Sequence, residues 1–272
     1  MSEVNNHIFD TIDRQNKHES AHTRRTLIKT TAAAMGSMGV LGFAANQAAA
    51  QGPDTDPPNT VENLAAVAAT AEVLATIVNT VGVERLGDRM DPVTRRNVAA
   101  AAQQEKNHYE LLTSNAVGGK AVTKTIFVPN SIFESPENLL TALVVGDQVF
   151  VNAYLLATTV FARMGTLAGS KFARYTAEIM AVESVHRALA LQSLGRLGND
   201  RAYAKFGQRE AVGGLPTTGQ GGFYRITEAV DVLESAGFGF GKVGSKPGTA
   251  YDYDTVAART PVVPGVNTLM IS

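Results

Sequence analysis

The sequence predicts an all-α protein built around a four-helix bundle. Four long segments carry apolar residues at helical spacing, and short stretches rich in glycine, proline or aspartate separate them. Two of these segments contain a Glu-x-x-His motif, which places a carboxylate and an imidazole on one helix face. A repeated Glu-x-x-His on two helices is the ligand pattern of di-metal carboxylate bundles.

The composition fits one globular domain of good size. Hydrophobic residues make up 44% of the 272 positions, charged residues make up 18%, and the formal net charge is −1. The balanced charge gives no indication of a nucleic-acid partner. The chain has no cysteine, so it has neither a disulfide framework nor a thiolate metal site.

Residues 1–50 resemble a twin-arginine export signal. A polar start leads to Arg24 and Arg25, then to a mildly apolar stretch, and finally to small residues that end at Ala50. We therefore expect cleavage near Ala50, a periplasmic or otherwise extracytoplasmic location, and the twin-arginine export machinery as a partner. The alternatives are a disordered tail with a short interfacial helix and an uncleaved membrane anchor, for which the apolar stretch is short.

After a proline-rich linker at residues 51–59, the first helix is expected from Val61 to about Val83, with Thr60 as its N-cap. Glu72 lies inside an otherwise small and apolar stripe of this helix. A carboxylate in such a stripe needs a partner, because burial of an unpaired charge is costly.

The second helix is expected from Pro92 to about Ser114. Asp91 is its N-cap, and proline suits the first helical position. Glu105 and His108 form the first Glu-x-x-His motif on the inner stripe of this helix.

A connection of about twenty residues follows, which is too long for a tight hairpin. It contains the extended-looking segment Thr123–Val128, and in a bundle it would be a crossover that runs the length of the molecule. The third helix is expected from Ser135 and Pro136 to about Arg163, with Asp147 on its inner stripe.

A membrane-spanning interpretation of Leu139–Ala162 is the alternative for the third helix. Asp147, Gln148 and Asn152 lie near the middle of this span. An aspartate at a bilayer centre costs about 2.5–3.5 kcal/mol on the insertion scale, so a buried bundle helix explains the span better.

The fourth helix is expected over Lys171–Arg196, with Glu183 and His186 as the second Glu-x-x-His motif. The bundle would then occupy residues 60–198. Residues 199–272 are rich in glycine, and we expect them to form an irregular C-terminal extension over the bundle with one short helix near Phe223–Ala236.

Both histidines that remain after residue 50 belong to these motifs. Glutamate is about one residue in twenty of that segment, so chance would give both histidines this neighbour in about 0.3% of cases.

In an antiparallel hairpin, facing residues are equidistant from the turn. Glu72 and Glu105 are centred on the turn at Gly87–Met90, and Asp147 and Glu183 are centred on Gly165. We therefore expect all the predicted ligands at one level of the bundle: Glu72, Glu105, His108, Asp147, Glu183 and His186.

These positions resemble the bacterial ferritin-like domain family that includes desiccation-related proteins. The resemblance covers about residues 60–198 and rests on Glu72, the two Glu-x-x-His pairs and the segment Asp147–Tyr154. It implies two bound metal ions, with iron favoured and manganese as the alternative. It also implies that Glu105 and Glu183 bridge the two ions. Glu72 and Asp147 would be terminal ligands, and each histidine would bind one ion.

The resemblance implies redox chemistry with O₂ or peroxide, as in a ferroxidase or a catalase-like enzyme, and protection against oxidative or desiccation stress. Asp147 departs from the glutamate usual in the superfamily, which puts the reaction in doubt more than the site. The alternative is a structural or protective extracytoplasmic module with a weak or vestigial metal site. A homo-oligomer is possible on this sequence, and Tyr109, Tyr154, Asn107, Gln148 and Asn152 are candidates for the surroundings of the site.

Overall fold

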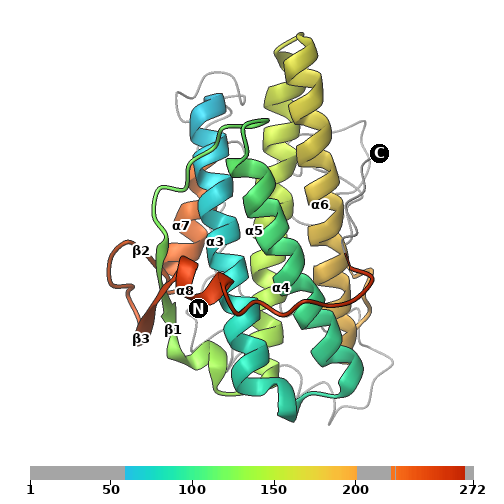
Figure 1. Ribbon diagram of the computed structural model, residues 1–272, viewed down its shortest axis with the longest axis vertical. Coiled ribbons are helices and arrows are strands. Elements are labelled where there is room, and N and C mark those ends of the chain that lie inside the picture. The colour runs from blue at the N-terminus through green and yellow to red at the C-terminus, as the bar shows by residue number, and fades with distance from the viewer. Residues whose placement is uncertain (1–58, 201–221, 224, 267–272) are drawn as a thin grey trace, which may run out of the picture.

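The computed structural model describes residues 59–200, 222–223 and 225–266. Its main feature is a bundle of four long helices that stand side by side (Figure 1). These are α3 (Val61–Leu86), α4 (Pro92–Thr113), α5 (Pro136–Arg163) and α6 (Leu167–Ser193). The predicted four-helix bundle is thereby confirmed. The export signal, its cleavage near Ala50 and nearly all of the linker lie outside the described residues, so they stay predictions.

Each long helix begins at a side chain that accepts a hydrogen bond from the first turn. Thr60, Asp91 and Ser135 cap α3, α4 and α5 as the sequence predicts. Thr166 caps α6 by accepting from the Gly169 amide, so this helix begins four residues earlier than the predicted start at Lys171. Gly165, at φ +63°, makes the turn from α5 to α6.

The helices form two hairpins that pack against each other. α3 packs mainly on α4, with the short 3₁₀ turn η2 (Gly87–Arg89) between them, and α5 packs mainly on α6. Further contacts join α3 to α5 and α4 to α6, so each helix has two neighbours in the bundle. A square arrangement of this kind directs one stripe of each helix toward a common axis.

The connection between α4 and α5 crosses the bundle, as predicted, and contributes to a small sheet. Strand β1 (Thr125–Pro129) lies in the middle, between β2 (Gly239–Phe240) and β3 (Gly248–Asp252), and both pairings are antiparallel. Ile126 and Val128 of β1 are fully buried. A further 3₁₀ turn, η3 (Asn130–Phe133), leads from β1 into α5.

The C-terminal extension is more regular than the sequence analysis suggests. The predicted short helix is present as α7 (Thr227–Ser235), but β2, β3 and the short helix α8 (Tyr253–Ala257) were not anticipated. The physical reason is that β2 and β3 form only by pairing with β1, which lies more than a hundred residues earlier in the chain. After α8 the chain crosses α4, as Figure 1 shows.

Two helices, α3 and α5, are long and apolar enough to cross a membrane by length and composition alone. However, 78% of the apolar window in α3 and 67% of that in α5 is buried inside the bundle. Burial of this kind is typical of core helices, and it supports the bundle interpretation of Leu139–Ala162.

Candidate metal centre

All four bundle helices contribute to one buried cluster of acidic and histidine side chains. Glu72 comes from α3, Glu105 and His108 from α4, Asp147 from α5, and Glu183 and His186 from α6. The three glutamates have 0% exposed surface, and the other three side chains are buried. The structure therefore brings together all six residues that the sequence analysis selects.

The cluster divides into two sets of potential ligands that share two members. One set contains Glu72, Glu105, His108 and Glu183, and the other contains Glu105, Asp147, Glu183 and His186. Within each set, one ligand atom from every residue lies within 4.8 Å of all the others. The shared carboxylates, Glu105 and Glu183, are the two residues that the family resemblance assigns as bridges.

The Nδ1 atom of each histidine faces the carboxylates. Nδ1 of His108 lies 3.2 Å from Glu183 Oε1, 3.3 Å from Glu105 Oε2 and 3.6 Å from Glu72 Oε2. Nδ1 of His186 lies 3.0 Å from Glu105 Oε1 and 3.6 Å from Glu183 Oε2. With metal–ligand bonds of about 2.0–2.2 Å, neighbouring ligands of one ion lie about 3 Å apart, so these separations suit a shared ion.

Several of these atoms are buried without a hydrogen-bond partner, although they lie close together. His186 Nδ1 and Glu105 Oε1 are 3.0 Å apart, yet neither atom makes a hydrogen bond. The same holds for both carboxylate oxygens of Glu183 and for one oxygen each of Glu72 and Asp147. Buried polar atoms are normally paired, so unpaired atoms that converge on one point fit a bound cation. The residues present therefore suit bound metal.

Burial and mutual charge shift the pKa values of the cluster strongly. Burial raises the pKa of the Glu72 and Asp147 carboxyls well above the ordinary range. Burial acts against protonation of His108 and His186, but the facing carboxylates outweigh it and raise both imidazole pKa values. At Glu105 burial is likewise outweighed, by His186 and His108, and the carboxyl pKa falls. A bound cation would displace these protons and would balance the negative charge of the carboxylates in their place.

Gln104 orients one of the histidines, and the sequence analysis missed it. Its Oε1 atom lies 2.8 Å from His186 Nε2, on the side of the ring away from the carboxylates. An amide oxygen can only accept, so Nε2 carries the hydrogen, and the lone pair of neutral His186 is at Nδ1. The only sequence signal for this role is that Gln104 directly precedes the predicted ligand Glu105. That position does not show which residue of another helix Gln104 contacts.

Tyr154 also contacts the cluster. Its hydroxyl donates a hydrogen bond to Glu72 Oε1, and burial raises its pKa well above the ordinary value. Tyr109, also considered in the sequence analysis, instead packs on Tyr253 with ring centroids 4.4 Å apart. Gln148 donates to Asn152 at 3.1 Å, so these two side chains contact each other.

A narrow cavity adjoins the cluster at Asp147 and His186. Its volume is about 20 Å³, roughly the room for a single water molecule, and its walls include Asn79, Asp147 and His186. The Asp147 side of the cluster is therefore the side with room for a small molecule.

The fold and the paired ligand sets agree with a comparison against protein families. The family described as ferritin-like domain matches residues 63–196. This chain carries a ferritin-like domain. The matched range includes all four bundle helices and all six cluster residues. Comparisons with curated proteins and with solved structures gave no match.

The ferritin-like domain ends before α7. It therefore does not include α7, α8 or the two edge strands of the small sheet, β2 and β3. The desiccation-related subtype and the roles of the six residues as metal ligands stay predictions. What the domain and the cluster together establish is a ferritin-like bundle with a Glu/His group suited to hold metal.

Proposed function

We propose that the mature chain is an extracytoplasmic ferritin-like protein that binds two iron or manganese ions and carries out redox chemistry with O₂ or peroxide. One observation carries the proposal: two four-residue ligand sets overlap in Glu105 and Glu183. Two separate mononuclear sites would not need to share carboxylates, whereas a pair of adjacent ions does.

The chemistry of the ligands supports the choice of metals. The cluster offers carboxylate oxygens and imidazole nitrogens and contains no thiolate, which suits iron and manganese. Four carboxylates inside one bundle repel one another, and two divalent ions would offset that charge. When bound, such ions would supply the electron exchange that O₂ or peroxide requires.

The protein side chains would position the ions and handle protons. Gln104 keeps Nδ1 of neutral His186 free to bind metal. The Tyr154 hydroxyl keeps its proton and donates a hydrogen bond to Glu72. Burial of the three glutamates keeps bulk water away from their carboxylates, which would hold the ions. A ferroxidase and a catalase-like enzyme would both use this arrangement, and both fit a role in oxidative or desiccation stress.

The test removes ligands from α6 and follows iron oxidation. In the double variant Glu183→Ala and His186→Ala, peroxide-dependent oxidation of Fe(II) should fall to the rate without protein. Glu178→Ala, on the same helix, removes an exposed carboxylate that pairs with Arg174, and it should leave the rate unchanged. Unchanged turnover in a folded double variant would remove the proposed centre.

A structural module with a weak or vestigial metal site is the second candidate. Its support is that protonated His108 and His186 can pair with the facing carboxylates and neutralise part of the charge without metal. This candidate predicts less than about one iron or manganese ion per chain after loading and a melting temperature that metal does not change. Elemental analysis and thermal melts of the loaded protein separate the two candidates.

A further inference from the structure

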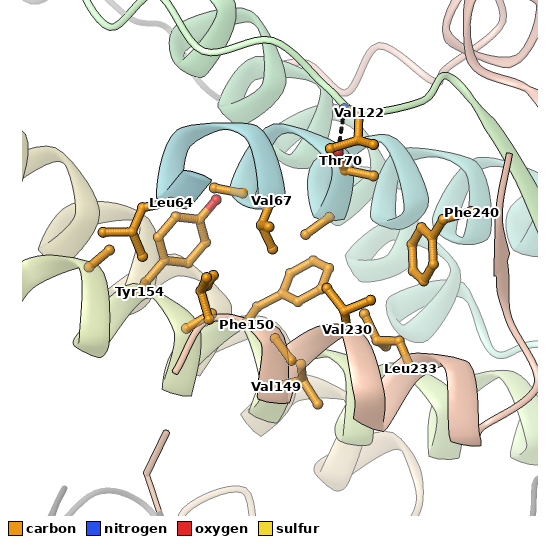
Figure 2. A pocket seen from close by; sticks show the side chains of 16 residues that line it. Leu64, Val67, Thr70, Val122, Val149, Phe150, Tyr154, Val230, Leu233 and Phe240 are labelled. Atoms are coloured by element: carbon orange, nitrogen blue, oxygen red, sulfur yellow. Dashed lines mark hydrogen bonds between the residues drawn. The ribbon is translucent and has the colours of Figure 1, made fainter. Parts of the chain in front are cut away.

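An apolar cavity lies beside the metal centre and is separate from it. It lies between α3, α5 and α7, with Val122 and Phe240 also in its wall (Figure 2), and it has a volume of about 110 Å³. Tyr154 forms part of its wall, and the hydroxyl of the same residue contacts Glu72. One aromatic ring thus stands between the cavity and the cluster.

The wall of this cavity offers a ligand almost no hydrogen-bonding group. Apart from Thr70 and Tyr154, every lining side chain is aliphatic or phenylalanine. The Thr70 hydroxyl donates to the Ala66 carbonyl at 2.7 Å and accepts from the Val122 amide at 2.8 Å. The Tyr154 hydroxyl is bonded to Glu72. An occupant therefore gains only from apolar contact, and a charged or strongly polar molecule would lose its hydration without replacement.

The size of the cavity sets the size of the occupant. An engineered apolar cavity of about 150 Å³ in another protein stays free of water and binds benzene or xenon. At about 110 Å³ this cavity is of the same order and has walls of the same chemistry. We propose that it binds a small, uncharged, apolar molecule, either a dissolved gas such as O₂ or a hydrocarbon no larger than benzene.

Helix α7 completes the site, although it lies outside the ferritin-like domain. Ala229, Val230 and Leu233 line the cavity from α7. Val67 of α3 and Phe150 of α5 are among the other lining residues (Figure 2). Without α7 these two bundle helices would present an open apolar trough. The C-terminal extension thus adds a third wall to this apolar binding site. Binding itself needs no metal, and only its link to the metal centre rests on the proposed function.

The test uses two probes, xenon and benzene, on the full mature chain in its metal-free form. We expect both probes, or xenon alone, to give saturable NMR shifts in the methyl groups of Val67, Val230 and Leu233. Val230→Phe places a ring in the cavity and should weaken binding at least tenfold. Val232→Phe is the matched control, because Val232 is also half-buried on α7 but does not line the cavity, and it should bind as the wild type does.

Saturable binding of xenon without benzene would assign the cavity to gases, and binding of benzene would assign it to hydrocarbons. The proposal would be overturned if neither xenon nor benzene gave saturable shifts. It would also be overturned if Val230→Phe bound the probes as tightly as the wild type does. If Val230→Phe does not fold, Val67→Phe fills the cavity from α3 and gives the same comparison. Because the metal-free protein is used, failure of the metal centre leaves these outcomes unchanged.

Discussion

The Oε1 atom of Gln104 lies 2.8 Å from Nε2 of His186, across the interface between α4 and α6. This contact leaves Nδ1 as the ring nitrogen that faces Glu105 and Glu183. Gln104, which belongs to neither Glu-x-x-His motif, thereby connects the two helices that carry these motifs.

Replacement of Gln104 by leucine should weaken metal binding while the fold is kept. Without the amide oxygen, His186 can rotate or take the other tautomer, and loss of such an outer partner costs about 10–100-fold in affinity. The measurement is a titration with Fe(II) or Mn(II). Gln103→Leu, the same substitution one residue earlier, should keep wild-type affinity, and equal loss in both variants would contradict the positioning role.

Gln103→Leu should instead release the C-terminal segment from α4. The Gln103 side chain accepts from the Val263 amide at 2.7 Å and donates to the Val266 carbonyl at 3.3 Å. With both bonds removed, amide exchange at residues 260–266 should become at least several-fold faster, because local opening there costs less free energy. Hydrogen–deuterium exchange measures this. Unchanged exchange in the variant would show that other contacts hold the segment.

Tyr154→Phe should destabilise the metal-free protein. The variant leaves Glu72 Oε1 buried without its donor, which costs about 1–3 kcal/mol of unfolding free energy. Denaturant unfolding measures the loss. Tyr175→Phe on α6 is the control, because Tyr175 is only half-buried, and its effect should stay within about 0.5 kcal/mol. Equal stability of Tyr154→Phe and wild type would contradict the role assigned to this hydrogen bond.

Metal loading should release protons, and its stabilising effect should grow with pH. The pKa values of His108, His186, Glu72 and Asp147 are all raised in the metal-free protein. At these four groups the folded state binds more protons than the unfolded state, so their contribution to stability falls as pH rises through the raised pKa values. Glu105, whose pKa is lowered, acts in the opposite sense, and only at acid pH.

Melting curves of metal-free and loaded protein from pH 6 to pH 9 check this prediction. The gap between the two melting temperatures should widen as pH rises, and titration in buffers of different ionisation enthalpy should show proton release. A gap that is constant or that narrows with pH would contradict the assignment of these groups as ligands.

The parts of this fold that the sequence predicts are those set by local signals. Thr60, Asp91 and Ser135 each start a helix through their own side chains, and the position of the turns puts Glu72 opposite Glu105. Inward-facing polar residues on otherwise apolar stripes, such as Glu72, stand out because burial of a carboxylate demands a partner.

The parts that the sequence does not predict depend on contacts between distant segments. Strands β2 and β3 have no strand pattern of their own, and their pairing with β1 decides their conformation. Gln104 resembles any other polar residue on a helix until α6 places His186 beside it. The apolar cavity likewise appears only when α7 packs across α3 and α5.

Anomalous scattering from crystals of the metal-loaded protein tests the central claim most directly. We predict two metal peaks per chain, one beside Glu72 and His108 and one beside Asp147 and His186, with Glu105 and Glu183 in contact with both. A single peak, or metal bound only at surface carboxylates, would contradict a di-metal centre.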